Sequence, residues 1–125
     1  MPELTLRFTS PLPLHSNQRL HRAQKAQRIA EVRTYAETMA RRAKVTLPDP
    51  CRCIVKIGWP TRHRRDDANA HDTVKAAVDG IVRAGWLVDD SNEHLQGPDL
   101  RGYYLGRKGC VEMTFCFVAV EEAAA

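Results

Sequence analysis

Residues 51–85, CRCIVKIGWPTRHRRDDANAHDTVKAAVDGIVRAG, decide the fold because they join a strand, a basic loop and a helix. Over residues 51–59 the apolar residues at every second position alternate with Arg52, Lys56 and Gly58, which is the two-residue period of a half-buried strand. Further on, apolar residues recur at the spacing of one helix face, and Gly85 is a typical helix terminator. That face consists of Val74, Ala77, Val78, Ile81 and Val82. Asp72 or Asn69 is predicted to cap the start of this helix.

The N-terminal part predicts one more strand and one more helix. Residues 4–9 alternate between apolar and polar side chains, and this strand ends at Pro11. A helix is predicted over about residues 24–44, with an apolar stripe along one side. The stripe consists of Ile29, Val32, Ala36, Met39, Ala40 and Ala43. Pro48 and Pro50 prevent the helix from continuing.

The C-terminal part predicts short strands joined by turns. A strand is expected around residues 93–96, followed by a turn at Gly97-Pro98. Residues 103–105 are expected to pair with the last strand, residues 110–120, through a hairpin at residues 106–109. One face of the last strand carries Val111, Met113, Phe115 and Phe117.

This β-α-β-α-β-β order predicts a single domain of the α/β or α+β class over residues 1–125. We expect a mixed sheet of about four to five strands packed with two main helices. A chain of this length can bury a core without disulfides or a structural metal. The tail, about residues 121–125, is expected to be frayed.

The two halves of the chain carry opposite net charge. Residues 1–65 hold 14 lysines and arginines against four acidic residues, whereas residues 66–125 hold five against eleven. A basic half is typical of nucleic-acid-binding proteins. It is also typical of a solvated, arginine-rich helix face, so the charge pattern leaves both interpretations open.

The remaining composition favours a protein of the cytoplasm with no membrane partner. The apolar fraction of 43% is that of an ordinary globular protein, and the apolar runs are too short to span a bilayer. The four cysteines, at positions 51, 53, 110 and 116, lie in or beside strand-like segments without zinc-ligand spacing. They are predicted to be free, buried thiols.

Acidic side chains bracket the second predicted helix. Asp66 ends the basic loop and Asp90 follows the helix, so the two meet if the helix packs back against the strand. Carboxylates that share a site repel each other unless they bind a cation, and oxygen donors favour Mg²⁺ or Mn²⁺. Such an ion activates water and polarises a phosphodiester, while Lys75 neutralises charge on the phosphate. The other oxygen donors nearby are Asp67, Asn69, Asp72 and Asp89.

Each of these residues also has a purely structural interpretation. Residues 89–92 have the composition of a turn, Asp72 that of a helix cap, and Lys75 that of a solvated helix face. His63 and His71 are interpreted as exposed histidines, since no further nitrogen or thiol lies at ligand spacing. Only the order and spacing of the residues favour the functional interpretation.

Residues 64–91, RRDDANAHDTVKAAVDGIVRAGWLVDDS, resemble the RusA family of Holliday-junction resolvases, whose members carry Arg-Asp-x-Asp-Asn, then a lysine, then Asp-Asp. The loop PLPLHSNQR, residues 11–19, is similar to the family's proline-rich loop ending in asparagine. The turn GPDLR, residues 97–101, is similar to variants from phages and actinobacteria. The resemblance covers most of the chain. It implies a small homodimer that cuts four-way DNA junctions with Mg²⁺ or Mn²⁺ in a bacterial cell or a phage-infected host.

The resemblance also assigns roles to individual positions. Asp66, Lys75 and Asp90 are expected to be catalytic, and the metal ligands to be Asp66 and Asp90 with Asn69 and Asp72. Ala68 departs from the pattern, because it stands where the family has its second acid. The DNA-contacting residues are expected in the two basic loops and at the start of the first helix. They are Asn17, Arg19, Arg22, Arg62, Arg64 and Arg65.

Three hypotheses follow. The first is a metal-dependent, structure-selective endonuclease acting on branched DNA, and the second, motivated by Ala68, is a junction-binding module with weak or no activity. The third is a nuclease for RNA or single strands. Aromatic residues make up only 6% of the chain and do not interleave with the basic loop, which argues against base stacking on single strands.

Overall fold

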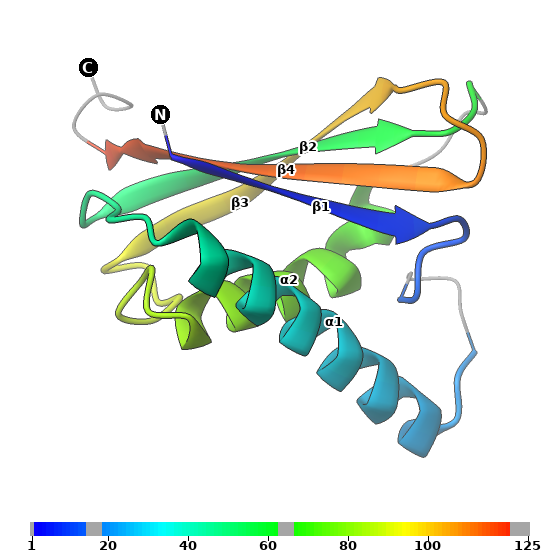
Figure 1. Ribbon diagram of the computed structural model, residues 1–125, viewed down its shortest axis with the longest axis horizontal. Helices are drawn as coiled ribbons and strands as arrows, with labels where there is room; N and C mark the ends of the chain where they lie inside the picture. The colour runs from blue at the N-terminus through cyan, green and yellow to red at the C-terminus, as the bar shows by residue number, and fades with distance from the viewer. Residues whose placement is uncertain (1, 15–18, 63–66, 121–125) are drawn as a thin grey trace.

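A computed structural model describes residues 2–14, 19–62 and 67–120. The element order is β1 (Glu3–Thr9), α1 (Arg22–Ala43), β2 (Cys51–Trp59), the 3₁₀-helix η1 (Asp67–Ala70), α2 (His71–Arg83), β3 (Leu95–Tyr104) and β4 (Cys110–Ala119). Figure 1 shows one twisted sheet with α1 and α2 both on the same face. The predicted mixed sheet with two main helices is therefore confirmed. Within the described ranges no helix combines the length and apolar character needed to cross a membrane.

The sheet has the strand order β1-β4-β2-β3. β4 pairs antiparallel with both β1 and β2, whereas β3 runs parallel to β2 at the edge. The parallel pair follows from α2, because a helical crossover returns the chain to the end of the sheet where β2 began. The expected tail, residues 121–125, lies outside the described residues.

The predicted hairpin between residues 103–105 and the last strand is wrong. Residues 95–104 form one continuous strand, and Tyr103 and Tyr104 pair with Gly58 and Trp59 of β2. Gly97 and Pro98 lie inside this strand, where the register shifts, instead of ending it. The position is tolerated because β3 is an edge strand, where proline's missing N–H breaks no ladder on the outer side.

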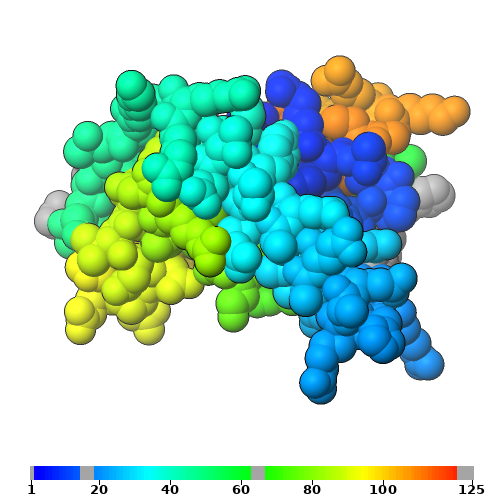
Figure 2. Space-filling view, turned by 60° about the horizontal axis from the view of Figure 1, so that its bottom comes forward, coloured from blue at the N-terminus to red at the C-terminus, as the bar shows by residue number. Residues whose placement is uncertain are grey.

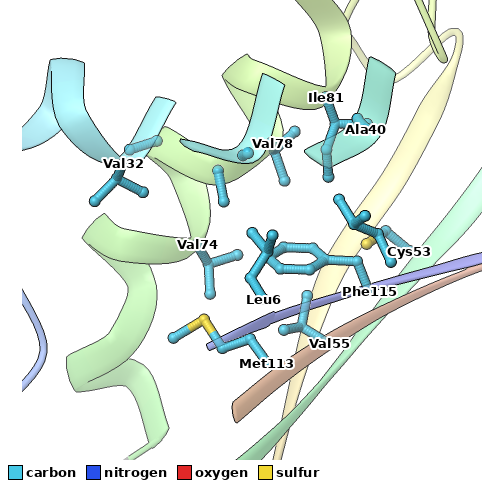
Figure 3. Packing of buried hydrophobic residues seen from close by; sticks show 14 of the residues in the cluster. Leu6, Val32, Ala40, Cys53, Val55, Val74, Val78, Ile81, Met113 and Phe115 are labelled. Carbon is cyan, nitrogen blue, oxygen red and sulfur yellow. The ribbon is translucent and has the colours of Figure 1, made fainter. Parts of the chain in front are cut away.

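The core lies between the inner face of the sheet and the two helices. Figure 3 shows Leu6, Val55, Met113 and Phe115 of the strands meeting Val74, Val78 and Ile81 of α2 and residues of α1. All four residues of the predicted inner face of β4, from Val111 to Phe117, are buried. The apolar periods of α2 and of three strands therefore identify the core correctly. The predicted stripe of α1 extends too far, because Ala43 at its end is exposed.

Gly80 allows the two helices to approach closely. A Cβ at this position would lie 2.9 Å from Ala36 Cβ and 2.9 Å from the Glu37 backbone N, and it would overlap the Arg33 carbonyl oxygen. The α1–α2 interface is thus built around a position that has no side chain.

The start of α2 differs from the prediction. Its N-cap is Ala70, which follows η1 directly, and no side chain caps the helix. Neither Asn69 nor Asp72 therefore caps it, because the 3₁₀ turn of residues 67–70 already leads the chain into the helix. α1 begins at Arg22, and His21 Nδ1 accepts a hydrogen bond from the Ala23 backbone N–H at 3.3 Å.

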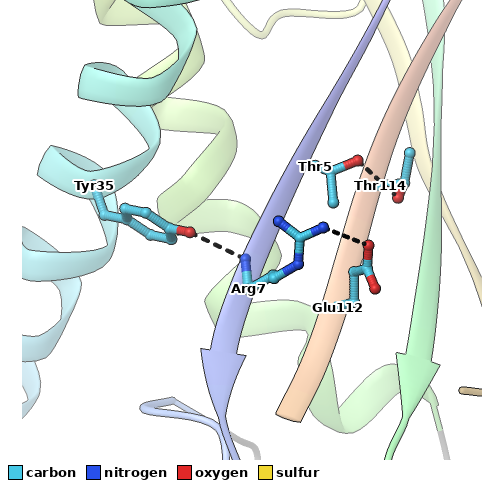
Figure 4. Close-up of polar contacts among 5 residues, drawn as sticks. All are labelled: Thr5, Arg7, Tyr35, Glu112 and Thr114. Carbon is cyan, nitrogen blue, oxygen red and sulfur yellow. Dashed lines mark hydrogen bonds and ion pairs between the residues drawn. The ribbon is translucent and has the colours of Figure 1, made fainter. Parts of the chain in front are cut away.

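Polar contacts hold the free edge of β1 and the outer face of the sheet. In Figure 4 the backbone N–H of Arg7 donates to the Tyr35 hydroxyl of α1 at 3.0 Å. Arg7 also contacts Glu112 across the outer face at 3.4 Å, beside a Thr5–Thr114 hydrogen bond of 3.2 Å. The Tyr35 contact occupies a donor on an edge strand, which reduces its capacity to pair with another chain.

The four cysteines are free thiols, as predicted. Cys51, Cys53 and Cys116 are buried, whereas Cys110 is only half-buried. Burial raises the pKa of the Cys51, Cys53 and Cys116 thiols, so all three behave as small apolar residues.

Candidate functional site

A pocket of about 180 Å³ lies between α2 and the first half of β3. It is lined by His71, Val74, Lys75, Val78, Asp90, Leu95, Gly97 and Pro98. Two of the three residues expected to be catalytic, Lys75 and Asp90, thus come together although they lie on different segments. The pocket has an apolar floor, and its chemically active groups are one amine, one carboxylate and one imidazole.

Helix geometry places the positive side of the pocket. His71 and Lys75 are separated by four residues in α2, so their side chains are neighbours on one face of the helix, with Cβ atoms about 5–6 Å apart. Both side chains are exposed, whereas Val74 and Val78 of the same helix are buried. The amine and the imidazole therefore stand at the solvent side of the pocket.

The loop after α2 brings Asp90 back toward the helix. α2 ends before Gly85, whose φ of 90° reverses the chain. Trp86 then anchors the loop, because its Nε1 donates to the Ala40 carbonyl at 2.9 Å and its ring packs edge-on against Phe117. The loop is thus held to α1 and β4 just before Asp90.

The two neighbouring carboxylates of this loop have different surroundings. Asp89 Oδ1 accepts the backbone N–H of Ser91 at 2.7 Å, and hydrogen bonds from Ser91 lower the pKa of Asp89. Asp90 takes part in no side-chain hydrogen bond or ion pair with another described residue. Asp89 therefore builds the turn, while Asp90 lines the pocket with its oxygens available to a ligand.

A second anchor holds the far end of the same loop. His94 Nδ1 lies 2.9 Å from Asp49 Oδ1, in the connection between α1 and β2, and the Cys51 backbone N–H donates to the His94 carbonyl at 3.0 Å. The hydrogen bond with Asp49 raises the pKa of His94, and the charges of Asp49, Asp89 and Glu93 act in the same direction.

We predict that this anchor depends on pH. A raised pKa in the folded state means that the pair stabilises the protein below the ordinary histidine pKa of about 6.5, and that this contribution disappears as the pH rises through the folded pKa. The difference in Tm between wild type and His94→Gln should therefore be larger at pH 5.5 than at pH 8.5. An equal difference at both values would contradict a charged pair.

Asp67 lies outside the pocket and has a structural role. Its Oδ1 accepts the Trp59 indole N–H at 2.9 Å, and its Oδ2 accepts the Gly102 backbone N–H at 2.9 Å. Gly102 lacks the Cβ that would overlap this carboxylate. Asp67 therefore ties η1 to the ends of β2 and β3, and neither it nor Asp89 is a free replacement for the acid missing at Ala68.

The remaining expected site residues are placed as follows. Asn69 in η1 and Asp72 in α2 are half-buried and are not among the residues that line the pocket. Asp66, Arg64, Arg65 and Asn17 lie outside the described residues. Arg19, Arg22 and Arg62 are exposed.

The N-terminal half of α1 offers a basic surface. Residues 21–27 are all exposed, and the first turn contains no acidic residue. Figure 2 shows this end of the helix projecting beyond the rest of the molecule. Its cations Arg22 and Lys25 are therefore accessible, whereas Arg28 is half-buried and its Nη1 donates to the Pro13 carbonyl at 3.0 Å.

The donors in the pocket suit a hard divalent cation only in part. Asp90 supplies free carboxylate oxygens, which Mg²⁺ and Mn²⁺ prefer, and His71 supplies a nitrogen. Within residues 2–14, 19–62 and 67–120 no group of three His, Cys, Asp or Glu side chains could hold an ion. A complete site would require a further donor, and Asp66 is the expected one.

His71 is the pocket residue that the sequence interpretation undervalued. The signal was its spacing of four residues from Lys75, which becomes informative only when the helix is known to begin at His71.

Comparison with protein-family models and with curated proteins gave no match for this chain.

Proposed function

We propose that this protein is a metal-dependent endonuclease that cuts four-way DNA junctions. The observation that carries the proposal is the meeting of Lys75 and Asp90 in one pocket, where no described residue hydrogen-bonds to the oxygens of Asp90. The basic surface of α1 favours a nucleic-acid substrate, and the resemblance of residues 64–91 to the RusA family favours a four-way DNA junction.

The expected catalytic and metal-binding residues have distinct roles in this proposal. A bound Mg²⁺ or Mn²⁺ would supply an activated water and a polarised phosphate. Asp90 and Asp66 hold the ion, with Asn69 and Asp72 as the further candidates. Lys75, exposed at the mouth of the pocket, neutralises charge that develops on the phosphate or on the leaving oxygen.

DNA binding is assigned to the exposed cations. Arg19, Arg22 and Arg62, with Asn17, Arg64 and Arg65, would contact phosphates and position the strand, and such contacts carry little base specificity. Binding should therefore weaken steeply as salt increases. A four-way junction has two-fold symmetry and needs two incisions, so an isologous homodimer suits it.

A substrate panel tests the proposal. Wild-type protein with Mg²⁺ or Mn²⁺ should cut a labelled four-way junction and leave the matching linear duplex, single strand and RNA uncut. Preferential cutting of RNA or of single strands would contradict the junction proposal and would favour a nuclease for those substrates.

The second candidate function, a junction-binding module without activity, is favoured by Ala68. This residue is exposed in η1, so an aspartate fits there without burial of its charge. If the chain lost activity by losing one ligand, Ala68→Asp should create or raise cleavage in Mn²⁺. Ala43→Asp adds the same charge at an exposed position at the end of α1 and should have no effect. An inactive wild type that stays inactive as Ala68→Asp would count against the loss of a single ligand.

A further inference from the structure

Tyr104, the last residue of β3, is half exposed yet held in place. Half of its surface, 50%, is accessible, and the guanidinium carbon of Arg62 lies over its ring, 4.5 Å from the ring centroid. Gly106, with a φ of 75°, also lies against the ring, because a Cβ there would come within 3.0 Å of Tyr104 Cζ. The guanidinium thus lies over the ring and places a positive charge on it.

This pair lies at the end of β3 that is next to η1, the segment that leads into α2. Tyr104 pairs with Trp59 in the parallel register, and Trp59 in turn donates to Asp67 at the start of η1. Because side chains alternate along a strand, Tyr104 shares a face of the sheet with Gly102, against which Asp67 packs. η1 leads directly into His71 and α2, so the pair borders the segment that reaches the pocket.

Tyr103 provides an internal comparison. It precedes Tyr104 in β3 and is 43% exposed, but it points to the other face of the sheet, where its ring covers Gly58. The two tyrosines therefore have similar exposure and chemistry and differ in the face that they occupy.

The surroundings of Tyr104 suit a nucleotide. Residues 101–108 contain three cations, Arg101, Arg107 and Lys108, and no acid, and all three are exposed. A base stacks on an aromatic ring or on a guanidinium plane irrespective of its sequence, while neighbouring cations neutralise the phosphate.

We propose that Arg62 and Tyr104 form a stacking platform for one unpaired nucleotide of the DNA. This inference rests on the proposed function, because the unpaired nucleotide is expected at the branch point of a junction, where bases can leave the helical stack. Aromatic residues do not interleave with the basic loop in the sequence, but the fold brings Tyr104 of β3 to Arg62 of that loop.

The test measures binding to junctions that lack one base. A panel of four-way junctions, each with a single abasic nucleotide next to the branch point, is titrated in EDTA so that nothing is cut. For at least one position wild type should lose about tenfold in affinity relative to the complete junction. Tyr104→Leu should bind both DNAs equally, whereas Tyr104→Phe and the control Tyr103→Leu should keep the wild-type difference. Arg62→Lys keeps the positive charge but lacks the planar guanidinium, so it should reduce the difference in affinity between the complete and the abasic junction.

Other outcomes would overturn the platform or the proposed function separately. If Tyr104→Leu discriminates the abasic junction as wild type does, or if Tyr103→Leu loses the difference equally, the platform is wrong, even when wild type binds and cuts junctions. If wild type ignores junctions but binds single strands in a manner that depends on Tyr104, the platform stands and the junction function fails. Tyr104→Phe keeps the ring and serves as the folded reference.

Discussion

Asp90→Asn is expected to bind a four-way junction as tightly as wild type and to cut it about 10²-fold more slowly or worse. The substitution keeps the shape of the side chain but removes the charge that would hold the ion in the pocket. Loss of groups that only support metal ligands already costs about 10–100-fold, so loss of a ligand should cost at least as much. The rates are measured in single-turnover cleavage of a labelled junction, and the affinities in a metal-free titration.

Asp89→Asn is the matched control. It removes the same charge one residue earlier, from a carboxylate that accepts the Ser91 N–H and builds the turn. Its effect on cleavage should be far smaller than that of Asp90→Asn. Wild-type cleavage by Asp90→Asn, or equal losses in both variants, would remove Asp90 from the proposed metal site.

Gly80→Ala should destabilise the fold by about 1–3 kcal/mol, the usual cost of inserting a methyl group into a well-packed interface. This is the reverse of the ordinary effect, because alanine in a helix interior is normally about 1 kcal/mol more favourable than glycine. The added Cβ would overlap the Arg33 carbonyl and crowd Ala36, so α1 and α2 would have to separate.

Urea denaturation measures the change in the free energy of unfolding. Arg83→Ala, at an exposed position of the same helix, is the control and should stay within about 0.5 kcal/mol of wild type. If Gly80→Ala were as stable as wild type or more stable, the close approach of the two helices would be wrong.

The elements that sequence predicted correctly are those whose period is uninterrupted. α2 and β4 present long apolar patterns of one period, and the structure buries the residues that these patterns select, apart from Val82, which is half-buried. β3 was divided in two because Gly97 and Pro98 have the local chemistry of a turn. Whether such a pair ends a strand depends on whether the strand lies at the edge of the sheet, and that is a property of the strand order.

The candidate site was predictable as a set of segments but not as a set of roles. Lys75 and Asp90 belong to the expected site, and they line one pocket. The predicted meeting of Asp66 with Asp90 lies outside the described residues. Trp59 and Gly102 both donate hydrogen bonds to Asp67 because β2 and β3 pair in parallel, and no local sequence pattern encodes that pairing. The contact of Arg62 with Tyr104 depends on the same pairing.

A titration with Mn²⁺ tests most directly whether Asp66 and Asp90 share one ion. Isothermal calorimetry on wild type should give one Mn²⁺ site per chain, and Asp66→Asn and Asp90→Asn should each weaken it by about tenfold or more. Because both residues would hold the same ion, the double variant should lose much less than the sum of the two single losses. Unchanged Mn²⁺ affinity in either single variant, or strictly additive losses, would show that the two carboxylates do not converge on a common metal.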